Sequence, residues 1–142
     1  MPLDDLLVRN TREWLARARD DLLVAENAAS QPAPAFKRDA LFHSQQAAEK
    51  ALKAFLTWHD IPFPRIHDLE QIGARCVDTD ASLQPVVDRA AQLSQYAWRF
   101  RYPGEAYEPS SKDIRQSLEF ARETCEAILA RLPNQVRLGS PD

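Results

Sequence analysis

Residues 42–56 read FHSQQAAEKALKAFL, and this stretch decides the fold class of the chain. It contains neither Gly nor Pro, and most of its residues favour helix over strand. Ala47, Ala51 and Phe55 recur near one face of a helix. The many small side chains on that face indicate that neighbouring helices pack closely against it. The stretch therefore predicts a long helix, over residues 36–59, at a tightly packed position in the fold.

Four further helices are predicted from apolar spacing on either side of that stretch. Ser82 is a suitable N-cap, and Ser110 with Asp113 has the spacing of a capping pair. Asn10 and Glu13 have the same spacing at the start of the first helix. The predicted helices span residues 11–28, 67–76, 82–102 and 110–132, with residues 3–8 as an additional turn packed on the bundle.

Helices with short connections and one apolar stripe each predict an all-α fold, an up-and-down antiparallel bundle of four to five helices. The chain has 142 residues, close to the commonest size of one domain, and shows no internal repeat. Pro133 ends the last helix. We therefore expect a single helical domain over residues 1–133 and a flexible C-terminal tail over residues 134–142.

Composition excludes several classes of protein. The formal net charge of −3 argues against a protein that coats DNA, although it leaves room for a local basic site. Cys76 and Cys125 stand alone, without the spacing of a zinc site, and we expect two buried, reduced thiols. A Gly-rich phosphate loop and a nucleophilic triad are absent, so neither a metal nor a cofactor is expected. With neither a bilayer-length apolar run nor a signal peptide, the expected location is the cytoplasm.

Several motifs in the chain resemble those of prokaryotic HEPN proteins (higher eukaryote and prokaryote nucleotide-binding), specifically the nucleotidyltransferase-associated type. The stretch over residues 42–56 is one of them, and an early helix carries Trp14 followed by ARDDL at residues 18–22. HDL at residues 67–69 and RYPG at residues 101–104 follow in the family's order. The resemblance implies a helical bundle that commonly forms a homodimer. It also implies a link to nucleotides or RNA, and a small nucleotidyltransferase as partner in a pair of the toxin–antitoxin kind.

The ribonuclease motif of many HEPN proteins is incomplete in this sequence. Those members use an Arg, a spacer of four to six residues and a His, but no His follows Arg99 and Arg101 here. His67 is the last His, and it reaches the same region only if the third helix begins beside the end of the fourth. A literal match at Arg38 and His43 lies at the start of the second helix, where we interpret it as chance. Arg99, Arg101 and His67 are thus only weak candidates for catalytic residues.

The candidate nucleotide or RNA site combines arginines with aromatic residues late in the fourth helix. An Arg can hold a phosphate while an aromatic ring stacks on a base. The candidates also have structural alternatives. The two arginines offset the charge of a helix C-terminus, and His67 with Asp68 starts a helix. Glu49 pairs with Lys53 on a solvated face. Tyr102 lies where a partner nucleotidyltransferase modifies some family members. The candidate residues are Arg99, Arg101, Tyr102, His67, Asp68, Gln46, Lys50 and Lys53.

Three hypotheses for the function remain open from the sequence. The first, which the missing His favours, is a dimer that binds nucleotide or RNA and works with a nucleotidyltransferase. The second is a metal-independent endoribonuclease toxin that uses Arg99 or Arg101 with His67 or His43. The third is a protein-interaction bundle without a ligand, for which an exposed apolar patch would be the sign.

Overall fold

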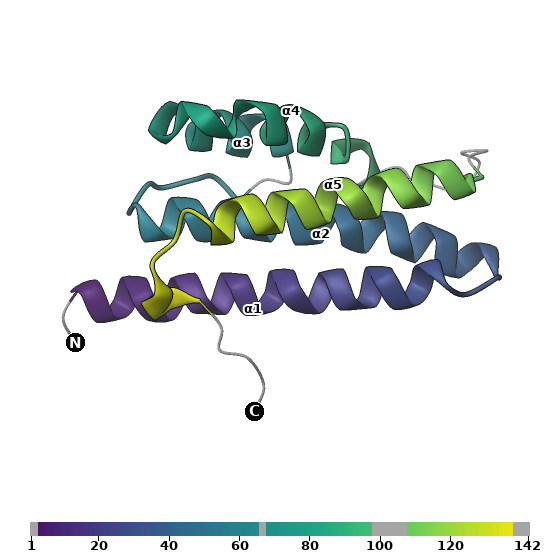
Figure 1. Ribbon diagram of the computed structural model, residues 1–142, viewed down its shortest axis with the longest axis horizontal. Coiled ribbons are helices and arrows are strands. Elements are labelled where there is room, and N and C mark those ends of the chain that lie inside the picture. The colour runs from purple at the N-terminus through teal and green to yellow at the C-terminus, as the bar shows by residue number, and fades with distance from the viewer. Residues whose placement is uncertain (1–2, 66–67, 98–107, 138–142) are drawn as a thin grey trace.

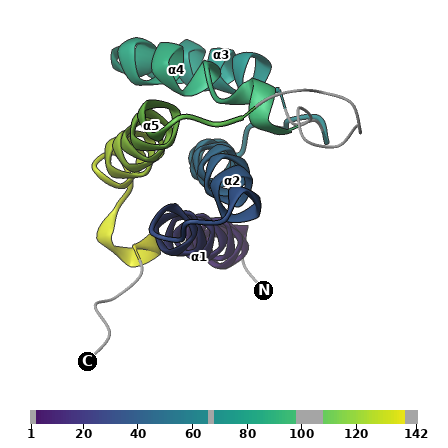
Figure 2. The ribbon, with the colours of Figure 1, turned by 90° about the vertical axis from the view of Figure 1, so that its right-hand side faces the viewer.

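The computed structural model describes residues 3–65, 68–97 and 108–137, and within these ranges every regular element is a helix. Helix α1 (Leu3–Ala29) and helix α2 (Pro34–Trp58) form an antiparallel pair, and α5 (Ser111–Leu129) lies along α2. The shorter helices α3 (Leu69–Thr79) and α4 (Gln84–Ala91) form a layer on the far side of α2 and α5 from α1 (Figures 1 and 2). The predicted all-α fold class is confirmed.

Helix α1 begins earlier than the sequence indicated. It runs without interruption from Leu3, so the predicted start at residue 11 and the capping pair of Asn10 and Glu13 are wrong. Asp4 and Asp5 occupy the first turn, where carboxylates favourably offset the positive end of the helix dipole. The predicted additional turn over residues 3–8 is therefore the first part of α1 itself.

The caps of α2, α3 and α5 follow simple local chemistry. Pro34 opens α2, because a proline at the first helical position lacks only an N–H that would have no helical partner anyway. Asp68 caps α3, which begins at Leu69 rather than at residue 67. The Ser110 hydroxyl accepts from the Asp113 amide while the Asp113 carboxylate accepts from the Ser110 amide, so the predicted capping box is confirmed.

The predicted fourth helix over residues 82–102 is divided in the structure. Ser82 does not cap α4; the carboxylate of Asp80 instead caps a 3₁₀ turn, η1 (Ala81–Leu83), ahead of it. Helix α4 ends at Ala91, and a second 3₁₀ helix, η2 (Ser94–Ala97), continues the chain. Tyr96 and Ala97 of η2 are buried. From the end of α4 into η2, buried residues keep a spacing of three, as Ala90, Leu93 and Tyr96, which 3₁₀ turns place on one side. Residues 98–102 of the prediction lie outside the described residues.

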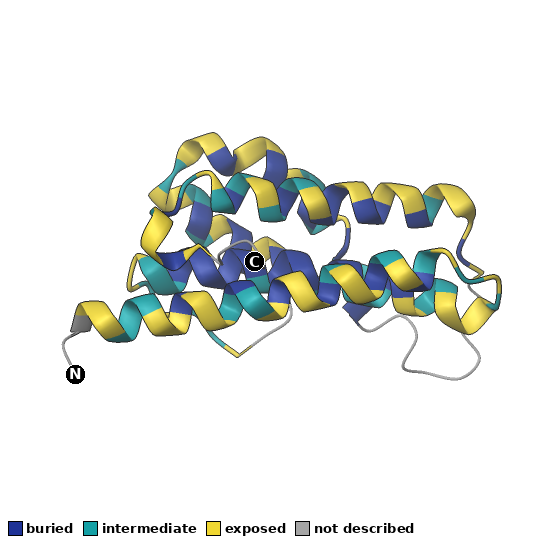
Figure 3. Cartoon of the chain, turned by 60° about the horizontal axis from the view of Figure 1, so that its bottom comes forward, coloured by how far each residue is buried: buried dark blue, intermediate teal, exposed yellow. Residues whose placement is uncertain are grey.

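The core lies between α1, α2 and α5 and extends beneath α3 and α4 (Figure 3). Helix α2 is its centre, since it contacts α1, α5, α3 and η2. The core reaches past Pro133, because a third 3₁₀ turn, η3 (Asn134–Val136), places Val136 fully out of solvent. The segment from residue 134 to residue 136, expected in the tail, thus packs on the domain, and residues 138–142 lie outside the described residues. None of the helices described here is long and apolar enough to cross a membrane.

Candidate functional site

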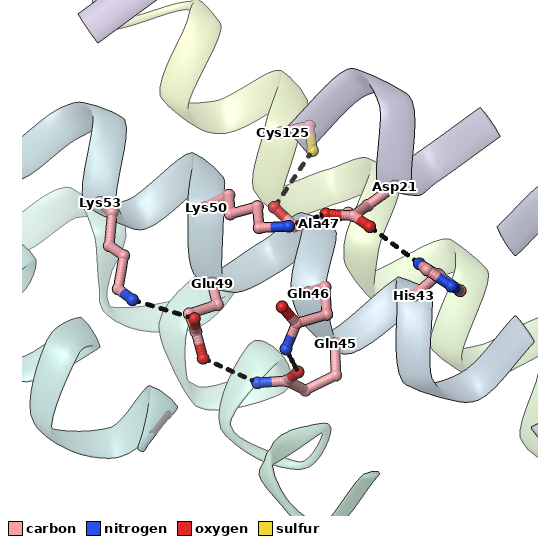
Figure 4. A network of polar contacts seen from close by, with 9 residues as sticks. All are labelled: Asp21, His43, Gln45, Gln46, Ala47, Glu49, Lys50, Lys53 and Cys125. Atoms are coloured by element: carbon pink, nitrogen blue, oxygen red, sulfur yellow. Dashed lines mark hydrogen bonds and ion pairs between the residues drawn. The ribbon is translucent and has the colours of Figure 1, made fainter. Parts of the chain in front are cut away.

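Four polar side chains form a continuous chain of hydrogen bonds inside the central helix (Figure 4). The Lys53 ammonium donates to Oε2 of Glu49 at 3.0 Å, and Nε2 of Gln45 donates to Oε1 of the same carboxylate at 3.1 Å. Gln46 Nε2 then donates to Gln45 Oε1 at 2.6 Å. We call these four residues the α2 network.

Three of the four residues of the α2 network are buried, and Gln46 is half-buried. Glu49 is 1% exposed and Lys53 is 7% exposed, while Gln45 is fully buried. The interpretation of Glu49 and Lys53 as a pair on a solvated face is therefore wrong, although the contact between residues four apart was predicted correctly. The physical reason is the position of α2, which neighbours cover on nearly every side. Charges at such depth persist only when they are paired and hydrogen-bonded.

Two aromatic rings from outside α2 enclose the Lys53 ammonium. Its Nζ lies 5.4 Å from the ring centroid of Trp14 on α1 and 5.6 Å from that of Phe63, and the two rings meet edge to face. These distances fall within the range of cation–π attraction. Phe63 belongs to the connection after α2, whose Pro62 carbonyl also accepts from the guanidinium of Arg75. Lys53 thus helps to fix the segment that leads toward His67 and Asp68.

A second group of charges joins α1 to α2 (Figure 4). The carboxylate of Asp21, 8% exposed, accepts from Nδ1 of His43 at 2.8 Å and from the Lys50 ammonium. We call these three residues the Asp21 cluster. An ionised carboxylate only accepts hydrogen bonds, so the contact assigns the Nδ1 proton to the imidazole. His43 is 27% exposed at its side chain, so the imidazole is partly open to solvent.

A thiol lies beside the Asp21 cluster. Cys125 Sγ lies 4.0 Å from the carbonyl oxygen of Ala47, and burial raises the pKa of this thiol to about 12, with the charges of Glu126 and Asp21 adding to the effect. Burial also raises the pKa of Cys76 to about 12. Both cysteines are free, Cys76 being buried and Cys125 half-buried. The neutral thiols therefore act as core residues, not as nucleophiles or ligands.

The predicted site residues separate into two sets in the structure. Asp68 is the N-cap of α3, where its carboxylate accepts from the Glu70 amide at 2.9 Å and from Gln71 Nε2 at 3.2 Å. The capping interpretation of Asp68 is thereby confirmed, and Gln46, Lys50 and Lys53 belong to the two groups on α2. The remaining candidates lie outside the described residues: His67, Arg99, Arg101 and Tyr102.

The described neighbours of those remaining candidates meet in space. The backbone N–H of Leu69 donates to Oγ of Ser94 at 3.3 Å, which joins the start of α3 to η2. Leu69 follows His67 by two residues, and η2 ends at Ala97, two residues before Arg99. The third helix therefore begins beside the last described turn of the fourth segment, while the end of that segment and His67 itself lie outside the described residues.

Sequence reasoning missed four residues of these groups: Asp21, Gln45, Trp14 and Phe63. A signal for Asp21 was present, because it stands between Ala18 and Ala25 on the buried face of α1. An acidic residue at such a position requires a cation opposite it. The aromatic enclosure of Lys53 had no comparable signal, since it joins α1, α2 and the following loop. Among the described residues, no three His, Cys, Asp or Glu side chains lie close enough together to hold a metal ion.

Comparison with known proteins places the chain in a family. The sequence model of the HEPN domain matches residues 11–132, most of the chain, and the protein therefore belongs to the HEPN family. The matched region begins within α1 and ends at Leu132, so it includes both polar groups on α2. No curated protein and no solved structure matches the chain. Membership of the HEPN family suggests a function related to nucleotides or RNA.

Proposed function

We propose that this HEPN protein binds a nucleotide or RNA at a site formed by Arg99, Arg101 and Tyr102 with His67. The observation that carries the proposal is the bond from Leu69 to Ser94, which brings together the described neighbours of the segments that hold these residues. The guanidinium of arginine is planar and always charged, and it can donate two parallel hydrogen bonds to one phosphate. A tyrosine ring next to it offers a surface on which a base can stack.

The two polar groups on α2 have a positioning role in this proposal. The Lys53 ammonium is buried among a carboxylate and two aromatic rings, and the Lys50 ammonium lies on Asp21, so neither is free to hold a phosphate. We assign the phosphate contacts to Arg99 and Arg101. In this proposal Lys53 acts through Phe63 on the segment that precedes His67. Gln46 and Lys50, both half-buried, are proposed to border the site.

The partners in the proposal follow from the family resemblance. We propose a homodimer that works with a small nucleotidyltransferase, in a pair of the toxin–antitoxin kind. Asp68 contributes by capping α3, which fixes the position at which the chain leaves His67. Tyr102 is then the residue that the partner would modify.

A ligand titration by thermal unfolding tests the nucleotide site. ATP, AMP, GTP and a short RNA are added separately to the parent protein, to Arg99→Ala and to Arg101→Ala. A ligand present at 100 times its dissociation constant adds about 2.7 kcal/mol of stability, which gives a clear rise in Tm. Arg115→Ala, at an exposed position of α5, is the matched control. We expect one ligand to raise the Tm of the parent and of the control but not of Arg99→Ala or Arg101→Ala. If none of the four ligands raises the Tm of the parent, the proposal is overturned.

A second candidate function is a metal-independent endoribonuclease, and the Asp21 cluster is the observation that favours it. Asp21 orients the imidazole of His43, as a base in a catalytic site is oriented by a third group. Arg38, five residues earlier and half-buried, has the family's spacing to this His. The check is cleavage of a labelled RNA in the presence of EDTA by the parent, His43→Asn and His67→Asn. Cleavage lost with one of these changes would assign the base, and the absence of cleavage by the parent would remove this candidate.

A further inference from the structure

A groove of about 400 Å³ runs between α3 and α4, away from both polar groups on α2. Its apolar lining, which we call the floor, consists of Ala74 and Val77 of α3 and Val87 and Ala91 of α4. Glu70, Asp78 and Asp88 form its rim. On each helix the lining positions include residues three or four apart, such as Glu70 and Ala74 or Gln84 and Val87, so each helix contributes one continuous face.

The two helices that form the groove are held close together. A Cβ atom added to Gly73 would lie 2.4 Å from Cγ1 of Val87, so the helices approach one another more closely than any other residue at position 73 allows. Their opposite faces bury Ile72 and Ala90 in the core. The groove therefore lies between two closely packed helices and opens on the side of the α3 and α4 layer that faces solvent, where Glu70 and Asp78 are exposed.

The rim of the groove carries carboxylates on both helices, two on α3 and one on α4. Glu70 and Asp78 are eight residues apart on α3, about 12 Å at 1.5 Å per residue, and their carboxylates form no ion pair with any described residue. Asp88, on α4, lies at the other edge and accepts from Gln84 Nε2 at 2.6 Å. No Lys or Arg is among the lining residues. A nucleic acid would be repelled by these carboxylates, because its phosphates carry the same charge.

We propose that this groove binds an amphipathic helix of a partner protein, with small apolar residues on the floor and Lys or Arg along both edges. Two adjacent helices present a groove into which the side chains of a third helix fit, which is a recurring mode of peptide recognition. Complementary charge fixes the register of such a complex and excludes other partners. A second copy of this chain, bound by the same groove on both copies, would bring two acidic rims together and be repelled.

A displayed library of helical peptides, about 14 residues long and random in charge and apolar positions, tests this proposal with the full chain. We expect the selected peptides to carry apolar residues at spacings of three and four, with Lys or Arg on both flanks. Binding of a selected peptide, followed by fluorescence anisotropy, should weaken about tenfold or more in the variant Glu70→Lys with Asp78→Lys. The control is Glu13→Lys with Glu119→Lys, which changes the net charge equally at exposed positions of α1 and α5.

The outcomes separate the proposal from its competitors. Loss of binding in the groove variant alone, with a steep dependence on salt, supports it. The proposal is overturned if the selected peptides lack basic residues, or if binding weakens equally in the groove variant and the control. It is also overturned if no selected peptide depends on Glu70 and Asp78 for binding. A dimer in light scattering that the groove variant dissociates also overturns it, since the occupant would then be a second copy. None of these readouts involves Arg99 or Arg101, so failure here leaves the proposed nucleotide site untouched.

Discussion

The carboxylate of Glu49 and the ammonium of Lys53, one helical turn apart on α2, form a 3.0 Å ion pair with almost no contact with solvent. Removal of two charges from water costs several kcal/mol per ion, and the attraction between them offsets this only when geometry and further hydrogen bonds are favourable. Here Gln45 donates to the same carboxylate, and Trp14 and Phe63 lie around the ammonium. Removal of either charge therefore leaves the other buried without its partner.

Glu49→Gln is expected to destabilise the protein by about 3 kcal/mol, because it leaves the Lys53 ammonium buried without its counter-charge. Lys53→Met should destabilise the protein by a similar amount, because it leaves the Glu49 carboxylate buried without the Lys53 ammonium. The double variant should cost less than the sum, with a coupling free energy of roughly 1–3 kcal/mol. Urea denaturation measures all three, and the exposed Glu119→Gln should stay within about 0.5 kcal/mol of the parent. A loss in Glu49→Gln as small as in the control would contradict the burial of the pair.

The pairing of Glu49 with Lys53 could be predicted from sequence, but its burial could not. A spacing of four along a helix is local, and the stripe of alanines next to it correctly indicated a tightly packed helix. Burial depends on how many neighbours surround α2, and this is a property of the whole bundle. For the same reason the capping box of Ser110 was predictable, whereas the role of Asp21, which connects α1 to α2, was not.

Asp21→Asn should lower the free energy of unfolding by about 1–3 kcal/mol, because a neutral amide no longer balances the Lys50 ammonium and the imidazole of His43. Its neighbour Asp20 is exposed, and Asp20→Asn is the matched control, expected within about 0.5 kcal/mol of the parent. Chemical denaturation of both variants under the same buffer gives the comparison. Equal stability of the two would mean that the Asp21 cluster contributes nothing to the fold.

Gly73→Ala should destabilise the protein, although alanine in a helix usually gains about 0.5–1 kcal/mol over glycine. The added methyl group would lie 2.4 Å from Cγ1 of Val87, and overpacking of this kind typically costs about 1–3 kcal/mol. Thermal unfolding should therefore show a lower Tm. The double variant with Val87→Ala removes the clashing methyl groups, so it should cost less than the two single changes together. A rise in Tm for Gly73→Ala would show that α3 and α4 separate easily.

The site is less predictable than the fold because it is assembled from segments far apart in the chain. HEPN membership and the cap at Asp68 follow from short motifs, the all-α class follows from apolar spacing within each helix, and all three are confirmed. The division of the fourth helix into α4 and η2 was missed, since apolar residues three apart suit an α-helix and a 3₁₀ helix alike. The roles of Arg99, Arg101, Tyr102 and His67 stay predictions, which the ligand titration tests directly.

Both thiols should be unreactive in the folded protein, because burial raises the pKa of Cys76 and of Cys125 from 9.0 to about 12. A rise of about three units lowers the fraction of reactive thiolate near pH 8 by roughly a thousandfold. Since the folded-state pKa values exceed the unfolded ones, the stability that the neutral thiols contribute is complete below pH 9 and lost as the pH rises from 9 toward 12. Ellman's reagent should therefore detect no thiol in the native protein near pH 8 and two after unfolding in urea. Cys76→Ala and Cys125→Ala assign each signal, and rapid labelling of either cysteine in the native state would refute its assignment as a core residue.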